Sequence, residues 1–311
     1  MKFAVVGNSV LDCYLLDLNA WPRKDGERAA ISGIEPHTGG NGLNVSLALA
    51  RLGNPDIDLY TAIGSDANGR VLCDAIDKGK VKLRNAAAGS RLGTTTAFLI
   101  LRDGKPSFII YGGCSDQITV SFLEKRFSEL AAADHLYING IGLFAGLDIY
   151  GLAKFVGRLR QANPTMRVYL DVAMVTEESA RKQKLAARIG RLLEQADFFF
   201  PNELEAMQYS AQGGEPTESR LLKAAEIFNR SLRVATLIKR GEQGVVIYPK
   251  DEKPFRVPTK PLPLRRVVDA TGAGDAWSAG FVSAYVAGKS LIESAKAGHA
   301  VARQVVQKRG S

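Results

Sequence analysis

Apolar and polar positions along the chain follow two periods, and their order predicts an α/β protein. Short apolar runs bounded by Gly, Pro, Asn or Asp are typical of buried strands. Segments with apolar residues three and four positions apart are typical of amphipathic helices. From residue 120 onward the two kinds alternate, which predicts a mostly parallel sheet with right-handed crossovers and helices on both faces. The predicted strands here are His135–Asn139, Arg167–Val172, Asp197–Phe200 and Val234–Lys239, and the predicted helices are Ile149–Gln161, Arg181–Gln195, Glu203–Tyr209 and Ser219–Asn229.

The first third of the chain has a less regular pattern. Lys2–Gly7 and Ile57–Gly64 are typical of strands, whereas Arg28–His37 mixes apolar and polar residues without helical spacing. Two further β runs, Leu92–Leu101 and Pro106–Tyr111, flank an Asp-Gly pair, which predicts a hairpin. These irregular segments predict a small separate sheet beside the main one.

Composition narrows the class without naming a function. The 311 residues are 46% hydrophobic and 23% charged, as expected for one large α/β domain, and no apolar run approaches the ~20 residues of a membrane span. The net charge of +9 is spread along the chain, whereas a nucleic-acid binder would concentrate it with aromatic residues. We therefore expect no nucleic-acid and no membrane partner, and a basic surface that is either simply solvated or steers anions such as ATP. Three scattered cysteines without a CxxC pair indicate a reducing cytoplasm and no zinc site.

The most informative stretch is Val268–Trp277. An apolar run ends at Asp269, and Gly272, Ala273 and Gly274 then precede Asp275 and a small-residue helix. Small residues let the backbone approach a ligand, and the first N–H groups of a helix form an anion site. A carboxylate beside such a site suits a base that takes a hydroxyl proton while the backbone holds a phosphate. The alternative is a tight turn in which Asp275 only caps the helix.

Two more polar groups stand where an open α/β sheet binds ligands. Asp12 follows the strand Lys2–Gly7, near the carboxyl edge of the sheet. Asn41 and Asn44 share one face at the start of the helix predicted after Gly40. Carboxamides donate and accept hydrogen bonds and therefore suit a ligand with several hydroxyls. The alternative is that one Asn merely caps the helix.

A third pair follows the apolar run Phe198–Phe200. Asn202 and Glu205 lie three residues apart at a predicted helix start. An amide and a carboxylate there suit a hydrated Mg²⁺ near phosphates. Taken alone, the pair is better explained as an N-cap with a capping-box glutamate.

Together these segments resemble one family, the ribokinase or PfkB-type carbohydrate and nucleoside kinases. The two longest signatures are specific, and they occur in the family's order with suitable separation. The resemblance covers nearly the whole chain. The segments that carry it are Gly39–Val45 with Ala48, Leu52 and Gly53; Ile63–Asp66 with Gly69; Pro201–Glu205; and Asp269–Asp275 with Gly280 and Phe281.

The resemblance implies a single ribokinase-like domain over residues 1–311. Its fold would be a three-layer α/β/α sandwich with a mostly parallel central sheet. A small β-sheet lid would be formed by about residues 13–38 and 92–113, and in the family such a lid often makes a homodimer contact. The implied reaction transfers the γ-phosphoryl group of ATP to a hydroxyl of a sugar or sugar-like molecule.

The resemblance also implies roles for single residues. Asp275 is similar to the catalytic base, and Gly272, Ala273 and Gly274 to the anion hole. The substrate hydroxyls would be held by Asp12, Gly40, Asn41 and Asn44.

For the cofactors, Asn202 and Glu205 would organise Mg²⁺ and phosphate. The turn from Lys239 through Gly241 to Gly244 and the region of His299 would flank the adenine of ATP. Asp269 and Thr271 resemble positions that hold a monovalent cation such as K⁺ in many members.

The chain departs from the family pattern near the substrate. Val10 stands where ribokinases proper have Asn, and Lys239 stands where many members have Thr or Ser. Three alternatives therefore stay open: a nucleoside kinase with stacking aromatics on the lid, a kinase for an already phosphorylated sugar, and a non-catalytic sugar or nucleotide sensor. The sensor would be expected to lose Asp275 or an anion-hole glycine, and both are present. The aromatic lid candidates for stacking on a nucleoside are Phe98, Phe108 and Tyr111. The basic lid candidates for a phosphorylated sugar are Arg28, Arg102 and Lys105.

Overall fold

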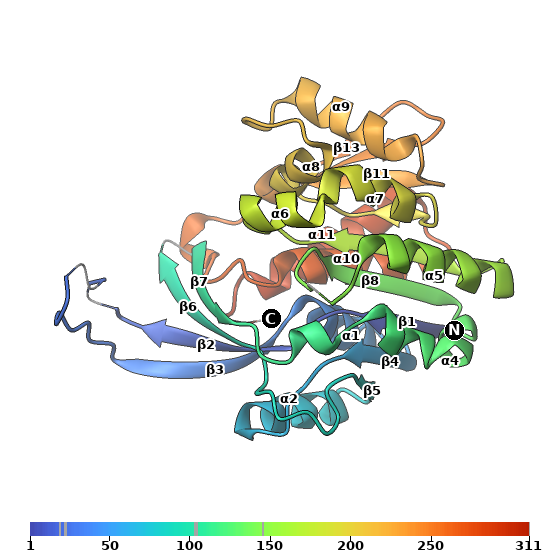
Figure 1. The fold of residues 1–311 in the computed structure, drawn as a ribbon. Coiled ribbons are helices and arrows are strands. Elements are labelled where there is room, and N and C mark those ends of the chain that lie inside the picture. The colour runs from blue at the N-terminus through green and yellow to red at the C-terminus, as the bar shows by residue number, and fades with distance from the viewer. Residues whose placement is uncertain (19, 22–23, 103–104, 145, 311) are drawn as a thin grey trace.

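The computed structural model describes residues 1–18, 20–21, 24–102, 105–144 and 146–310 (Figure 1). A nine-stranded sheet runs through the molecule in the order β13-β12-β11-β10-β9-β8-β1-β4-β5. The pairs from β5 to β11 are parallel, and only β11–β12 and β12–β13 are antiparallel. The strands are β1 Lys2–Val6, β4 Asp56–Thr61, β5 Lys82–Asn85, β8 His135–Ile141, β9 Arg167–Val172, β10 Phe198–Phe199, β11 Ala235–Lys239, β12 Val245–Pro249 and β13 Phe255–Val257.

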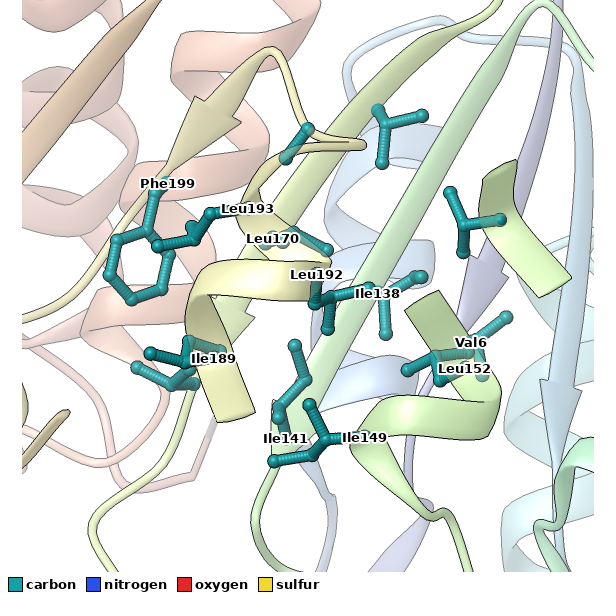
Figure 2. Close-up of a cluster of buried hydrophobic side chains, with 14 of the residues drawn as sticks. Val6, Ile138, Ile141, Ile149, Leu152, Leu170, Ile189, Leu192, Leu193 and Phe199 are labelled. Atoms are coloured by element: carbon teal, nitrogen blue, oxygen red, sulfur yellow. The ribbon is translucent and has the colours of Figure 1, made fainter. Parts of the chain in front are cut away.

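Helices cover both faces of this sheet. Strand residues alternate between the two faces: Phe3 and Val5 of β1 belong to one buried cluster, and Ala4 and Val6 to the other. The Phe3 cluster packs under α1 Asn41–Arg51, α2 Ala67–Lys78, α10 Ala273–Val286 and α11 Leu291–Val305. The Val6 cluster, part of which Figure 2 shows, packs under α3 Val120–Glu124, α4 Phe127–Ala131, α5 Ile149–Ala162, α7 Leu185–Leu193, α8 Glu203–Ser210 and α9 Glu218–Asn229. The predicted three-layer α/β/α architecture is confirmed.

One predicted helix is wrong in its continuity. The segment Arg181–Gln195 is divided between α6 Glu177–Gln183 and α7, and Lys184 joins them with a left-handed φ of 51°. Residues 181–184 are all polar, so no apolar spacing marked the joint. The predicted strands Ile57–Gly64 and Leu92–Leu101 are also displaced, since β4 ends at Thr61 and β6 begins at Thr96.

A second sheet of four strands stands beside the main one (Figure 1). Its order is β3-β2-β6-β7, with β2 and β6 parallel and the outer pairs antiparallel. The turn of the β6–β7 hairpin, residues 103–104, lies outside the described residues. The strands are β2 Val10–Leu16, β3 Gly33–Gly39, β6 Thr96–Arg102 and β7 Lys105–Tyr111.

The strand order places a ligand site at one edge of the main sheet. From β1 the chain proceeds outward through β4 and β5 on one side, and from β8 outward on the other. Between β1 and β8 the direction of travel reverses, and such a switch point opens a crevice at the carboxyl ends of the strands. Helix α1 begins beside this crevice, because Asn41 at its start accepts a hydrogen bond from the Asn139 side chain of β8.

Candidate active site

The start of α1 is shaped by a close approach to the end of β1. Gly40 precedes the helix with a φ of 93°, and a Cβ there would lie 2.7 Å from the Asn8 carbonyl oxygen. Only glycine fits this position. The Asn8 carboxamide oxygen accepts the N–H of Asn41 at 2.9 Å, so a residue outside the helix caps it. Neither Asn41 nor Asn44 caps α1 with its side chain, so the alternative that one of them only caps the helix is wrong.

The start of α10 has no side-chain cap. Gly272 takes a left-handed conformation with a φ of 72° just before the helix, and no side chain caps this end. In the first turn, the N–H of Ala273 donates to the Ala270 carbonyl oxygen at 3.2 Å, whereas the N–H groups of Gly274 and Asp275 have no acceptor from the helix itself. The explanation of Asp275 as a mere helix cap is therefore wrong.

Asp275 is instead held by carboxamides from three other places in the chain. Its Oδ1 accepts hydrogen bonds from Asn41 at 3.3 Å and Asn139 at 3.1 Å, and its Oδ2 accepts one from Asn44 at 2.9 Å. Burial and the negative charge of Asp171 raise the pKa of Asp275 to about 6, although the amides oppose that rise. The result is a buried, oriented carboxylate that takes up a proton near neutral pH.

A second buried carboxylate comes from the small sheet. Asp12 lies within β2 and is 5% exposed. Burial, followed by the negative charges of Asp269 and Asp275, raises the pKa of Asp12 to about 7. The two charges that raise the pKa of Asp12, those of Asp269 and Asp275, are both negative.

A third carboxylate, Asp171 at the end of β9, is paired with a lysine. Lys239 at the end of β11 donates to Oδ1 and Oδ2 of Asp171 at 3.1 and 2.9 Å. Tyr137 and Ser278 each donate a hydroxyl to Asp171 Oδ2 at 3.0 Å. Burial raises the pKa of Asp171, although the Lys239 charge opposes that rise. This cluster connects three strands and α10 directly behind the anion-binding turn.

The Asn202–Glu205 pair forms a capping box. Asn202 Oδ1 accepts the N–H of Glu205 at 2.9 Å, and Glu205 Oε2 accepts the N–H of Asn202 at 2.7 Å. Burial raises the pKa of Glu205 to about 7. The described residues contain no cluster of three or more His, Cys, Asp or Glu able to hold a metal alone. The amide and carboxylate oxygens of Asn202 and Glu205 are of the kind that can contact waters around Mg²⁺.

Asp269 accepts hydrogen bonds where a cation ligand would need free oxygens. Tyr14 and the N–H of Gly310 donate to its Oδ2, and the N–H of Thr271 donates to its Oδ1. Burial alone would raise the pKa of Asp269, but hydrogen bonds from Thr271 and Tyr14 outweigh it and lower that pKa. Asp269 thus accepts one hydrogen bond at Oδ1 and two at Oδ2.

The residues expected around adenine lie at the far end of the sheet edge. Gly241 and Gly244 have φ values of 53° and 88° and bound a short turn after β11. His299 of α11 accepts a hydrogen bond from Trp277 at its Nδ1, and its Nε2 lies 3.0 Å from the Val257 carbonyl oxygen. Both ring nitrogens are thus engaged, and only the ring surface of His299 could contact a base.

The site contains residues that the sequence pattern did not single out for it. Asn139 is the only carboxamide in β8, and Asn8 lies two residues after the end of β1. Both occur at carboxyl ends of strands, which is a usable signal, but only the strand order shows that they meet Asp275 and α1. Asp171 ends β9 in the same way.

Comparison with known proteins identifies the family. The profile of the family described as pfkB family carbohydrate kinase matches residues 2–311. The chain is 27% identical over 288 residues to an Escherichia coli 2-dehydro-3-deoxygluconokinase, covering 88% of this chain and 89% of that protein. It is 28% identical over 318 residues to an Arabidopsis thaliana ribokinase, covering 99% and 76%.

Solved structures share the fold. A ribokinase from Thermotoga maritima superimposes with a TM-score of 0.79 at 24% identity, covering all of this chain and 94% of that one. The Arabidopsis thaliana ribokinase solved with ribose and ATP gives a TM-score of 0.76 at 24% identity, covering 100% and 94%. No helix in the described part of the chain is long and apolar enough to cross a membrane. With a family profile matched from residue 2 to residue 311 around this site, the chain belongs to the pfkB family of carbohydrate kinases.

Proposed function

We propose that this kinase phosphorylates a neutral polyhydroxy acceptor, a sugar or nucleoside, with Asp275 as the base. One observation carries the proposal: Asp275 is buried at the start of α10, beside uncapped backbone N–H groups, and held by the amides of Asn41, Asn44 and Asn139. The amides fix the carboxylate, and the helix terminus faces the same space.

The proposed reaction is an in-line phosphoryl transfer. A lone pair of the acceptor hydroxyl attacks the γ-phosphorus of ATP, and the hydroxyl proton passes to Asp275. The bond between the γ-phosphorus and the bridging oxygen breaks, and its electron pair stays on ADP. The helix start at Gly272, Ala273 and Gly274 would stabilise the charge on the transferring group, with the Gly274 N–H as a donor and the helix dipole adding to it.

Mg²⁺ is the cation that this proposal requires. When bound it neutralises charge on the ATP phosphates. Asn202 and Glu205 would hold its hydration shell, which fits a single buried carboxyl near phosphates better than a complete protein cage. We leave K⁺ out of the mechanism, because Asp269 already accepts three hydrogen bonds.

The charge around the acceptor argues for a neutral molecule. Asp12 and Asp275 both face this region, and the charges that act on Asp12 are negative. A sugar acid or sugar phosphate would bring a further anion, and repulsion between like charges in a buried site lowers its affinity relative to that of a neutral acceptor. Asp12, Asn41 and Asn44 offer the acceptors and donors that hydroxyls need. Of the basic lid candidates, Arg28 is exposed, and the side chains of Arg102 and Lys105 lie outside the described residues.

The remaining expectations concern assembly and compartment. We propose that the small sheet, with the lid expected over about residues 13–38 and 92–113, closes over the acceptor and contacts a second copy of the chain. Strand β7 supports this, because four consecutive apolar residues, which alternate between its two faces, are each about half exposed: Phe108, Ile109, Ile110 and Tyr111. Three free cysteines support a cytoplasmic protein.

A release assay for ADP tests the acceptor class. The purified chain with Mg²⁺-ATP is given matched neutral and anionic acceptors: hexoses and pentoses, nucleosides, the corresponding sugar acids, and sugar phosphates. We expect kcat/KM for the best neutral acceptor to exceed that of its acid counterpart by at least ~10-fold.

The substitution Asp12→Asn provides the internal control. Removing one negative charge should reduce the ratio of kcat/KM for a neutral acceptor to kcat/KM for its acid. It should also lower turnover of the neutral acceptor. A sugar acid as the best substrate of the unsubstituted chain would refute the neutral-acceptor proposal. If a ligand binds tightly but no acceptor causes ADP to be released from ATP, the sensor is favoured instead.

A further inference from the structure

Lys239 occupies a position that the proposed mechanism does not yet use. Its side chain is 14% exposed, and its partner Asp171 is 2% exposed. Burial lowers the pKa of this amine, but the charges of Asp171 and Glu205 outweigh burial and raise it, so the amine is a stable cation. A buried ion pair contributes little or no net stability compared with well-packed apolar residues. Stability therefore does not explain why a charge is kept here.

The ammonium group lies against the anion-binding turn. A Cβ built on Gly274 would sit 3.6 Å from Lys239 Nζ, and no other heavy atom lies so near that open side of the glycine. Ser278, one turn farther along α10, donates its hydroxyl to Asp171 Oδ2, which also accepts from Lys239. Asp171 therefore holds the ammonium beside the first turn of α10.

The ammonium also keeps a donor for a ligand. An ammonium has three N–H donors. Two are used by the Asp171 oxygens at 3.1 and 2.9 Å, while the nearest further acceptor, Ser278 Oγ, lies at 3.5 Å, the limit of a hydrogen bond. Three carboxyl groups, those of Asp171, Glu205 and Asp275, surround this one amine. It is the positive charge that acts on Asp275.

We propose that Lys239 is a further catalytic residue, whose ammonium binds a γ-phosphoryl oxygen of ATP at the Gly274 turn and follows that group as it is transferred. This assignment rests on the proposed function and refines the expectation that Lys239 flanks the adenine. The amine keeps its proton throughout. The acceptor oxygen forms the new bond to phosphorus, its proton goes to Asp275, and the electron pair of the broken bond stays on ADP.

The role predicts a selective loss of affinity. ADP lacks the γ-phosphoryl group, so only a nucleotide that carries it gains from the lysine. In the full-length chain, calorimetry with Mg²⁺ should show that Lys239→Met binds β,γ-imido-ATP about 10- to 100-fold more weakly, as expected for a lost charge-assisted hydrogen bond. The affinity for ADP should change by no more than about twofold, because ADP does not reach the amine.

Two further variants protect the test from general damage to the cluster. Ser278→Ala removes a hydrogen bond to the same carboxylate but keeps the ammonium, so its preference for β,γ-imido-ATP over ADP should stay as in the unsubstituted chain. Lys239→Arg keeps the positive charge and should retain most of that preference. Lys239→Gln, which removes the charge but keeps a polar end, serves as the test variant if Lys239→Met does not fold.

The outcomes separate the two proposals. Equal losses for both nucleotides, no loss for either, or loss of the preference in Lys239→Arg would overturn the assignment of Lys239. If the unsubstituted chain still releases ADP with an acceptor, only that assignment falls. If the unsubstituted chain binds neither nucleotide, the kinase function and the role of Lys239 fall together.

Discussion

At the scale of single residues, the site is a carboxylate whose proton affinity is set by its neighbours. Burial and Asp171 push the pKa of Asp275 upward, and the amides of Asn44 and Asn139 hold it down. The balance leaves a base that is mostly ionised at pH 7 yet basic enough to accept a hydroxyl proton, which is the range in which general bases work best.

The pH dependence of turnover should report this balance. A base acts only when deprotonated, and the pKa of Asp275 is raised to about 6. At saturating Mg²⁺-ATP, kcat/KM for the acceptor should therefore fall about tenfold per unit below pH 6 and level off above pH 7. Asn44→Ala removes an amide that lowers the pKa, so the acid limb should move to higher pH.

Asn54→Ala is a matched control for that shift. Asn54 also links α1 and α10, since its amide donates to the Leu49 carbonyl oxygen of α1 and to Ser283 of α10, and it makes no hydrogen bond to Asp275. Its removal should cost stability in thermal unfolding and leave the pH profile unchanged. An identical displacement of the profile in both variants would mean that Asn44 acts only through the packing of α1 on α10.

Sequence reasoning found some of these residues and missed others for a physical reason. Asp275, Asn41 and Asn44 stand at helix starts, where local spacing shows which side chains share a face. Asn139 and Asp171 stand in strands, and which strands are neighbours depends on pairings between distant parts of the chain. Their roles could not be read from local pattern.

At the scale of elements, the site depends on how closely α1 approaches β1. A Cβ on Gly42 would lie 2.7 Å from the Cα of Gly7, a distance that atoms of two backbones cannot adopt without moving. The helix carries Asn41 and Asn44 toward Asp275, so its depth sets the geometry of the base. The sequence predicted this helix, but it did not show that Gly42 is needed for the close contact with Gly7.

Gly42→Ala should therefore harm both stability and turnover. Overpacking a tight interface costs about 1–3 kcal/mol in the free energy of unfolding, and an outward shift of α1 should lower kcat. Denaturant unfolding and steady-state kinetics measure the two effects.

Gly190→Ala offers the opposite expectation at another helical glycine. Nothing lies within 4 Å of a Cβ at Gly190 in α7. The substitution should raise the free energy of unfolding by about 0.5–1 kcal/mol, because alanine favours the helix, and leave kcat unchanged. Stabilisation by both substitutions would disprove the close contact between α1 and β1.

At the scale of the whole molecule, the small sheet exposes apolar side chains along one edge. Strand β7 lies at its edge, and Ile110 is 62% exposed and Phe108 50%. An exposed apolar edge strand is a surface prone to pairing with another chain. The alternating sequence of the hairpin predicted its strands, whereas its exposure depends on the absence of a covering helix in the described structure (Figure 1).

Sedimentation velocity tests whether a second copy covers this sheet. We expect the unsubstituted chain to sediment as a dimer and Ile110→Asp as a folded monomer, because a charge cannot be buried in an apolar contact without a partner. Ile292→Asp, which changes an exposed apolar residue of α11 (46% exposed), should stay dimeric. A monomeric unsubstituted chain would refute the contact.

The central claim is that Asp275 accepts the proton while the start of α10 holds the transferring phosphate. A single-turnover measurement with γ-labelled ATP and the best acceptor tests it most directly, in the unsubstituted chain and in Asp275→Asn. Asparagine keeps the shape of the side chain but cannot take the proton, so we predict that the rate of label transfer falls by at least ~10²-fold while affinity for ADP stays within a few-fold. Transfer by Asp275→Asn at a near-normal rate would contradict the account.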